Sequence, residues 1–429
     1  MKKSTIQSIK GFMDILPEDI KYYNHFESIS SLIAKRYSVK EIRLPIIEKT
    51  ELFKRSVGIT SDIVHKEMYD FIDKNGESIC LRPEGTASIV RACIQNSLIY
   101  DRGIKKQKYW YSGSMFRHEK PQRGRYRQFN QFGIEYFGYN DTNCDLDLIL
   151  LGNDLFYTLG IKKLSLHINS LGNTEDRSNY SQQIYNYLKK NSSSMDESQL
   201  KTLERNPLRL LDSKSENIAE FLKGAPLLYD NLCTSSKKRY DLLLDKLDDM
   251  NISYKHDNSI VRGLDYYNDT VFEWRHSGLG SQGTICAGGR YDNLVNIIGN
   301  VSVPAIGFAI GIERIIEVLQ IEDYHIDKIE IINIPIINTS SEKYAYCAKN
   351  TLALRREFNT KVNFSVMDSS SSLSSQTKHS LKINNKFIII FTDDNVKNHT
   401  ITLKSGDNKM ADVVITKDEL FKKIRDMFL

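Results

Sequence analysis

A long hairpin, predicted over residues 115–138, constrains the fold of this chain more than any other stretch. Aromatic, β-branched and alternating residues run up to Glu119, and a similar run resumes at Arg127. The stretch between them, Lys-Pro-Gln-Arg-Gly-Arg-Tyr, has the composition of a loop. The pattern therefore predicts two antiparallel strands joined by a long basic loop, with the first strand beginning at Lys108.

The two strands are expected to gather polar side chains on common faces, because side chains of equal parity share a face of a strand. Arg117 and Glu119 then point to one side of the first strand. Phe129, Gln131 and Glu135 share a face of the second. If the two faces coincide, one surface offers an arginine for phosphate, an aromatic ring of the size that stacks on adenine and a carboxylate for a cation. The alternative is an ordinary amphipathic hairpin with a solvated basic tip.

The composition is typical of a soluble globular protein with enough apolar residues for real cores. Of the 429 residues, 40% are hydrophobic and 26% are charged, and the length predicts two or three domains. No uninterrupted apolar run approaches the length of a membrane span, and the basic start lacks the apolar stretch of a secretory signal. The six cysteines form no Cys-x-x-Cys pair, which argues against structural zinc or a disulfide framework and favours the reducing cytoplasm.

The order of predicted elements indicates a β-rich body that is interrupted by a helical block. Before the block we expect a helix over 18–37, an edge strand over 41–48 broken by Pro45, a strand over 78–82, a helix over 87–96, a helix over 141–159 and a strand over 164–169. The block runs from 173 to about 251 and includes helices at 178–190, 208–211 and 237–250. After it come strands at 259–265, 270–275 and 283–287.

Two short segments in this body have more than one interpretation. Glu84 and Thr86 precede the predicted helix 87–96, where a glutamate and a threonine can simply cap the helix and complement its dipole. Gly288 and Gly289 follow the predicted strand 283–287, and paired glycines there either let the backbone approach a ligand closely or form an ordinary turn. Arg314 is clearer, because it falls in the first turn of a helix, at the end that attracts anions.

The last hundred residues predict a separate small α/β domain. The expected elements are strands at 329–337, 361–367, 386–392, 399–404 and 409–415, and helices at 342–356, 372–383 and 417–428. Residues 328–429 carry 16 Lys and Arg against 11 Asp and Glu, an excess that equals the net charge of +5 of the whole chain. A basic domain on a neutral body suits a polyanion such as nucleic acid.

Taken together, these stretches resemble the class II aminoacyl-tRNA synthetases and, among them, the histidyl-tRNA synthetase family. The strand with Pro45 is similar to motif 1, Phe116-Arg117-His118-Glu119 through Glu135 to motif 2, and Gly311-Ile312-Glu313-Arg314 to motif 3. Two further stretches resemble the histidine-specific segments of that family: Arg262-Gly263-Leu264-Asp265-Tyr266-Tyr267 and Ala287-Gly288-Gly289-Arg290-Tyr291-Asp292. The stretch Leu81-Arg82-Pro83-Glu84-Gly85-Thr86 adds to the resemblance. The resemblance spans essentially the whole chain.

The resemblance implies a fold class and a division into domains. It implies an α+β catalytic core with a mainly antiparallel sheet flanked by helices, a helical insertion, and a C-terminal α/β domain like those that bind anticodons. The expected bounds are 1–172 and 256–322 for the two parts of the core, 173–255 for the insertion, 323–328 for a linker and 329–429 for the C-terminal domain. A homodimer with the motif 1 proline at its interface is implied as well.

The resemblance also implies ligation of L-histidine to its tRNA through histidyl-adenylate, at the expense of ATP. The residues implied for ATP are Arg117, Glu119, Arg125, Phe129 and Arg314. Those implied for histidine are Glu84, Thr86, Arg117, Gln131, Glu135, Arg262, Tyr266 and Tyr267. Arg262 and Arg117 are the implied catalytic residues, with Arg262 against the α-phosphate where other class II enzymes place a metal ion. The loop residues Lys120, Gln122 and Arg123 are expected to touch the acceptor end of tRNA.

The sequence also allows two other interpretations. A synthetase-like regulatory protein would bind histidine or tRNA without catalysis, but such paralogues typically lose motif residues or the C-terminal domain, and both are present here. A protein-held metal is not expected, because His118 and Glu119 point oppositely in a strand and no Cys or His ladder accompanies them. The expected metal is Mg²⁺ that travels with ATP. The serine run at 368–375 departs from the glycine and basic residues usual there in the family, so no anticodon contacts can be named.

Overall fold

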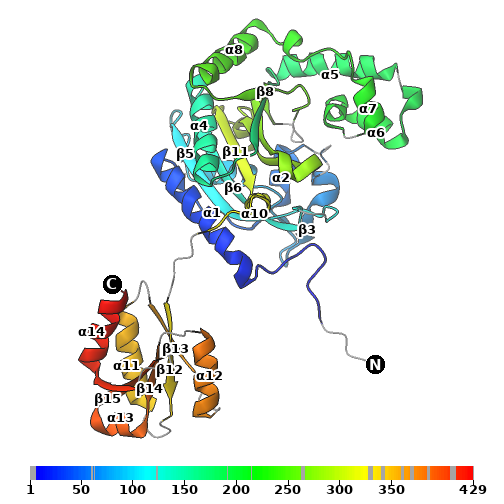
Figure 1. The fold of residues 1–429 in the computed structure, drawn as a ribbon. Helices are drawn as coiled ribbons and strands as arrows, with labels where there is room; N and C mark the ends of the chain where they lie inside the picture. The colour runs from blue at the N-terminus through cyan, green and yellow to red at the C-terminus, as the bar shows by residue number, and fades with distance from the viewer. Residues whose placement is uncertain are drawn as a thin grey trace, which may run out of the picture. The chain divides into compact units, whose positions relative to one another are not determined.

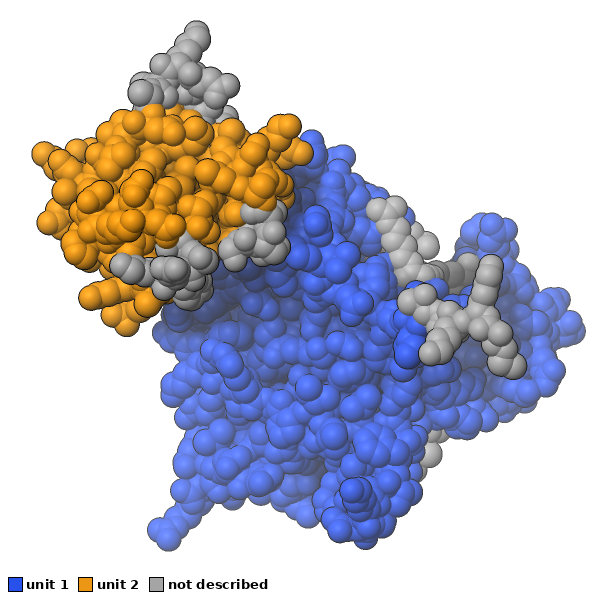
Figure 2. All heavy atoms as spheres, turned by 90° about the horizontal axis from the view of Figure 1, so that it is seen from below, with its two compact units in different colours: residues 1–325 blue, residues 326–429 orange. Residues whose placement is uncertain are grey.

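The chain folds as two compact units, residues 1–325 and residues 326–429, which are described separately (Figure 2). The computed structural model (Figure 1) describes residues 6–58, 61, 63–121, 124–190, 192–213, 215–261, 266–326, 332–339, 344–358, 362–367, 372–383, 387–405 and 412–428.

The first unit is built on an eight-stranded sheet. In spatial order its strands are β1 (Lys40–Glu41), β5 (Gln107–Phe116), β6 (Gln128–Phe137), β11 (Ala305–Gly311), β10 (Thr284–Arg290), β9 (Asn268–His276), β7 (Leu164–Ser170) and β8 (Tyr254–His256). Only the outermost pairs, β1 with β5 and β7 with β8, are parallel. The predicted mainly antiparallel sheet is therefore confirmed, and the predicted hairpin is its β5–β6 pair.

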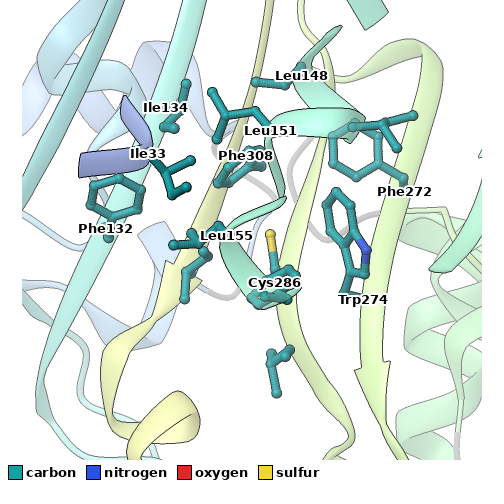
Figure 3. Close-up of a cluster of buried hydrophobic side chains, with 14 of the residues drawn as sticks. Ile33, Phe132, Ile134, Leu148, Leu151, Leu155, Phe272, Trp274, Cys286 and Phe308 are labelled. Carbon is teal, nitrogen blue, oxygen red and sulfur yellow. The ribbon is translucent and has the colours of Figure 1, made fainter. Parts of the chain in front are cut away.

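Large apolar side chains and helices cover one face of this sheet. The helices are α1 (Pro17–Arg36), α4 (Thr142–Thr158) and α10 (Ile312–Ile321). Figure 3 shows side chains of α1 and α4 packed against Phe132, Ile134, Phe272, Trp274 and Phe308 of the strands. Because Phe132 and Ile134 have even numbers, the odd-numbered residues of β6 lie on the other face. None of the helices in the described part of the chain combines the length and apolar composition that a membrane span needs.

A second, three-stranded sheet corrects the prediction around Pro45. Its strands are β2 (Ile47–Lys49), β4 (Ser78–Leu81) and β3 (Tyr69–Ile72), with β4 in the middle. The helix α2 (Thr50–Ser56) packs against β2 and β4, and α3 (Thr86–Gln95) and α9 (Leu294–Gly299) pack against α2 and against each other. The single strand predicted over 41–48 is wrong. Pro45 has no N–H to donate to a ladder, and the chain instead leaves β1 of the large sheet before it and enters β2 after it.

The helical block is confirmed between β7 and β8. It contains α5 (Thr174–Lys189), α6 (Glu197–Arg205), α7 (Glu216–Phe221) and α8 (Thr234–Asp249), with short helical turns at Ser192–Ser194, Pro207–Asp212 and Tyr229–Asn231. A capping box begins α5, in which Asn173 and Asp176 exchange hydrogen bonds. The strand predicted at 259–265 is wrong over 259–261, because the strand that pairs with β7 lies earlier, at β8. Residues 262–265 lie outside the described part.

The paired glycines of β10 do not form a turn, and the strand predicted to end at Ala287 continues through them. Gly288 and Gly289 stay in the strand, which runs to Arg290 and pairs with β9 and β11. A Cβ on Gly288 would lie 2.4 Å from the carbonyl oxygen of Gly307, so the glycine is needed for close approach of two strands. The turn predicted over 266–269 is also too long, since β9 begins at Asn268.

The second unit has the predicted α/β order with one further helix. Its elements are β12 (Ile332–Asn338), α11 (Tyr344–Glu357), β13 (Val362–Val366), α12 (Leu373–Ile383), β14 (Phe387–Phe391), α13 (Asp393–Asn398), β15 (Thr400–Ser405), β16 (Val413–Thr416) and α14 (Lys417–Phe428). The sheet order is β13-β12-β14-β15-β16, with β13, β12 and β14 parallel and the rest antiparallel. The prediction missed α13, which Thr392 and Asn395 start with a capping box.

Candidate active site

Glycines line the face of the large sheet that α1 and α4 leave open; we call it the site face. Gly133 of β6, Gly307 of β11 and Gly289 of β10 belong to it, and Gly307 pairs with both Gly289 and Glu135. A Cβ on Gly307 would lie 1.6 Å from Oε2 of Glu135, and one on Gly133 would lie 2.3 Å from the ring of Tyr111. The glycines therefore make room for polar side chains that lie flat on the sheet.

Two buried carboxylates meet on this face through a threonine. The carboxylate of Glu84 accepts hydrogen bonds from the backbone N–H groups of Thr86 (2.7 Å) and Ala87 (2.8 Å) in the first turn of α3. Oγ1 of Thr86 donates to Oε1 of Glu135 at 2.8 Å. The threonine cap of the simpler interpretation does not form, because Gly85 is the N-cap residue and Thr86 is the first residue of α3. Glu84 instead satisfies the first N–H groups of the helix, next to a second buried acid. This juxtaposition is what sequence spacing alone does not reveal.

Burial favours the neutral, protonated forms of both carboxyl groups. It raises the pKa of Glu135 to about 8, although the hydroxyls of Tyr291 (2.5 Å) and Thr86 donate to it and favour the anion. Burial also raises the pKa of Glu84, against the two backbone hydrogen bonds. A positively charged ligand group placed between them would restore the anions, so the pocket is electrostatically suited to a cation.

An aromatic wall adjoins the carboxylates. The ring centroid of Tyr266 lies 4.8 Å from that of Tyr267 and 5.8 Å from that of Tyr291, and all three side chains are buried. The carbonyl of Tyr267 accepts from Nη1 of Arg177 at 3.3 Å, which ties this wall to α5 of the helical block. Three aromatic faces beside two acids form a pocket of the kind that holds a flat, polar ring.

Sequence reasoning did not assign two residues of this pocket, Tyr111 and Tyr291. Tyr291 follows Gly289 and Arg290 in the sequence, and nothing in that spacing distinguishes it from an ordinary core tyrosine. Tyr111 lies in β5, directly across from Gly133. The available signal was the parity of β5, which puts Tyr111 on the same face as Gly113 and opposite the odd residues of β6.

The arginine clamp lies just beyond the end of β5. Nε of Arg117 donates to the carbonyl of Pro83 at 2.8 Å, and its Cζ lies 5.3 Å from the ring centroid of Phe129. Nη1 of Arg117 lies 3.7 Å from Oε1 of Glu119, and Nη1 of Arg125 lies 3.2 Å from Oε2 of the same carboxylate. The predicted group of arginine, aromatic ring and carboxylate is therefore assembled.

Arg117 and Glu119 do not lie in a strand, so the predicted strand parity is wrong for this pair. The first strand ends at Phe116, three residues earlier than predicted. Arg117 still pairs through its N–H with the carbonyl of Arg127 (2.8 Å), but the next N–H, that of His118, turns to the carbonyl of Glu67 (2.7 Å). The side chains of Arg117 and Glu119 meet across this bend and not by strand parity.

Motif 3 is anchored to β6 by its glutamate. Glu313 accepts from the backbone N–H and from Nδ2 of Asn130, both at 2.9 Å. Its neighbour Arg314, the third residue of α10, donates through Nη1 to the carbonyl of Thr284. Burial and the charge of Arg125 lower the pKa of Arg314, so the region around it accepts negative charge.

The remaining residues that the sequence predicted for the site lie on the site face, in the loop between β5 and β6, or outside the described part of the chain. Oε1 of Gln131 is buried on the site face and has no hydrogen-bond partner among the residues that the structure describes, which leaves an acceptor for a ligand. Lys120 and Arg125 are exposed in the loop between β5 and β6. Arg262, Gln122 and Arg123 lie outside the described residues.

The large sheet is mainly antiparallel, its β5–β6 hairpin carries Arg117 and Glu119, and the helix after β11 carries Arg314. This combination defines a class II aminoacyl-tRNA synthetase. Within that class, the chain belongs to the histidyl-tRNA synthetase family. The family model described as histidyl-tRNA synthetase matches residues 11–315, and the one described as anticodon binding domain matches residues 332–427.

Individual relatives agree along the length of the chain. A histidine–tRNA ligase of Buchnera aphidicola subsp. Schizaphis graminum is 42% identical over 424 residues, which are 99% of this chain and 98% of that protein. One from Hydrogenovibrio crunogenus is 48% identical over 73% of each chain. The structure of apo histidyl-tRNA synthetase from S. aureus superposes with a TM-score of 0.77 at 30% identity, and it covers 98% of this chain and 99% of its own.

Proposed function

We propose that this protein is a histidine–tRNA ligase, an enzyme that joins L-histidine to its cognate tRNA in two steps. In the first, histidine reacts with ATP to give histidyl-adenylate and pyrophosphate. In the second, the histidyl group passes to the terminal adenosine of the tRNA and AMP leaves. The observation that carries the proposal is the buried pair Glu84 and Glu135, bridged by Thr86, beside the Arg117 clamp.

ATP binds to the clamp in this proposal. Arg117 grips the α-phosphate, Glu119 accepts from the adenine amino group, and Phe129 stacks on adenine. Arg125 and Arg314 stabilise the remaining phosphates. Two facts support these roles: Arg117 already lies over the Phe129 ring, and both Arg117 and Arg125 lie within 4 Å of the Glu119 carboxylate.

Histidine binds in the acidic pocket. Glu84, Thr86 and Gln131 hold the ammonium group and the backbone polar atoms, while Glu135 faces the imidazole between Tyr266 and Tyr267. The raised pKa of Glu135 supports a ligand with positive charge. Oε1 of Gln131, which has no hydrogen-bond partner among the described residues, supports a ligand with N–H donors. A pocket with such buried polar groups rejects amino acids that lack the ring nitrogens far better than an apolar slot could.

The chemistry requires positioning and positive charge more than a general base. The histidine carboxylate attacks the α-phosphorus in line, the bond to the bridging oxygen breaks, and pyrophosphate leaves with its electrons. Arg117 and Arg262 stabilise the charge on the α-phosphoryl oxygens, since the arginine fork donates two hydrogen bonds and keeps its charge. ATP enters as its Mg²⁺ complex, in which phosphate oxygens supply the hard ligands that Mg²⁺ prefers.

The tRNA is proposed to meet the chain in two places. The loop residues Lys120, Gln122 and Arg123 contact its acceptor end, and the second unit binds its anticodon. The basic excess of residues 328–429 and the match of residues 332–427 to an anticodon binding domain support the second contact. The proposed domain bounds remain 1–172 and 256–322 for the core, 173–255 for the insertion and 329–429 for the anticodon domain, with 323–328 as linker.

We also propose that the enzyme is a cytoplasmic homodimer. The edge strand β2 follows the motif 1 proline, and Ile46 and Ile47 there are 45% and 49% exposed. Phe71 and Ile72 on the opposite edge strand, β3, are 45% and 66% exposed. Such a group of exposed apolar side chains is suited to burial against a second copy.

The decisive experiment is ATP–pyrophosphate exchange with each amino acid in turn, followed by charging of tRNA. Exchange that depends on histidine alone is expected, and folded protein without it would support the regulatory alternative. Arg262→Ala should abolish adenylate formation and leave the fold and histidine binding largely intact. Truncation after Asp327 should weaken tRNA charging much more than exchange, whereas equal losses would contradict a tRNA-docking role for the second unit.

A further inference from the structure

A segment near the N-terminus lies against the base of the loop that joins β5 to β6. We call residues 9–12 the N-terminal strap. The carbonyl of Gly11 accepts a hydrogen bond from the backbone N–H of Arg127 at 2.8 Å. The ring centroid of Phe12 lies 6.5 Å from that of Phe116, the last residue of β5. The strap therefore contacts the hairpin at the end where its two strands leave the sheet.

Gly11 lets the strap come this close to the hairpin. Its backbone φ is +90°, a conformation that residues with a side chain rarely adopt. A Cβ at Gly11 would lie 2.8 Å from Cγ of Arg127 and 3.1 Å from Cγ of Pro121. Both atoms lie near the backbone of their residues, so they cannot swing aside as the tip of a long side chain can. Any other residue at this position would push the strap and Arg127 apart.

Arg127 connects the strap to the bend that carries Arg117 and Glu119. Its Nε donates to the backbone carbonyl of Glu119 at 3.3 Å, and its Nη1 donates to that of Lys10 at 3.3 Å. Its own carbonyl accepts from the backbone N–H of Arg117 at 2.8 Å. Because the guanidinium is planar and its donors are fixed relative to one another, it holds the two carbonyls in a set arrangement. One residue thus ties the backbone at both Arg117 and Glu119.

We propose that Arg127 is a positioning residue for ATP, which acts through Arg117 and Glu119 and does not itself touch the nucleotide. The inference rests on the function proposed above, because Arg117 and Glu119 form the clamp there. The adenine amino group and the α-phosphate belong to one molecule, so the two residues bind them together only if their backbones are correctly spaced. The hydrogen bonds of Arg127 set that spacing. The sequence does not distinguish this arginine from the other cations of the basic loop.

The test begins with Arg127→Ala in histidine-dependent pyrophosphate exchange, well below the thermal midpoint of the variant. The KM for ATP should rise about tenfold. The KM for histidine should stay within about twofold, because Glu84 and Glu135 are held by hydrogen bonds from α3 and Tyr291. Arg127→Lys keeps the charge but loses the planar fork, so it should resemble Arg127→Ala. An unchanged KM for ATP in Arg127→Ala, or full recovery in Arg127→Lys, would overturn the inference, the latter in favour of direct contact with a phosphate.

Gly11→Ala should raise the KM for ATP through the same contact, so the double variant with Arg127→Ala should be no worse than the worse single variant. Gly76→Ala is the matched control. Gly76 has a φ of +83° in the turn between β3 and β4, but a Cβ there meets nothing within 4 Å, and the KM for ATP should stay at the parent value. Effects of Gly11→Ala and Arg127→Ala that multiplied would contradict the inference. Failure of the proposed function is a separate result, namely no histidine-dependent exchange by the parent protein.

Discussion

Gly307 and Phe308 are neighbours in β11 and show how differently the two faces of one sheet are used. Phe308 points into the core, where Figure 3 shows it among side chains of α4, β9 and β10. Gly307 points to the site face and has no side chain, so that Glu135 can lie over it. One face is filled to stabilise the fold, and the other is emptied so that polar groups and a ligand fit. The two requirements alternate with every residue of the strand.

If packing on the core face stabilises the fold, truncating its largest side chains should lower the free energy of unfolding the most. Phe308→Ala should destabilise the first unit by about 3–5 kcal/mol, from lost burial and the cavity left behind. The folded fraction should keep its KM for histidine, since Phe308 does not face the pocket. Chemical denaturation and exchange kinetics below the midpoint measure the two effects. A cost under about 1 kcal/mol would mean that this core is not closely packed.

The adjacent residue should show the reverse pattern. Gly307→Ala places a Cβ where Oε2 of Glu135 now lies, so Glu135 must move out of its bonds with Thr86 and Tyr291. Misplacing a binding group by this much should lower kcat/KM for histidine about 10²-fold.

The control for this variant is Gly103→Ala, because a Cβ at Gly103 meets nothing within 4 Å. It should leave the kinetics unchanged. If Gly307→Ala retained the parent KM for histidine, the position of Glu135 would not matter for binding, and the assignment of the site face would fail.

The site face should also make the stability of the protein depend on pH. Burial raises the pKa of Glu135 from 4.5 in water to about 8. Between these values the folded chain holds a proton that the unfolded chain has lost, so this group's contribution to stability is complete below pH 4.5 and is lost as the pH rises towards 8.

Glu135→Gln removes this contribution. From pH 5.5 to pH 7.5 the free energy of unfolding of the parent protein, without histidine, should fall relative to that of the variant by up to about 2–3 kcal/mol. Urea denaturation at several pH values measures the difference. Parallel stability curves for the two proteins would show that Glu135 titrates in its ordinary range.

The same contrast explains what could be predicted from the sequence. The core face follows from alternation and apolar composition, and the motifs placed Glu84, Glu135, Arg117 and Arg314 near one another. The ends of β5 and the course of the chain around Pro45 were wrong, because hydrogen bonds to distant carbonyls, such as that from His118 to Glu67, decide where a strand stops. Tyr111 was missed for a related reason. Its place in the pocket depends on Gly85, which is brought beside it only by the tertiary fold.

The smallest expected effect tests whether the two faces are independent. Ile134→Val removes one methylene from the core face, next to Glu135 in sequence but on the opposite side of β6. Stability should fall by about 0.5–1.5 kcal/mol with an unchanged denaturant slope. The KM for histidine should not change, because the strand is held by ladders on both sides and a lost methylene does not shift it. A rise in KM that accompanied so small a loss of packing would mean that the core face sets the position of Glu135 through the backbone.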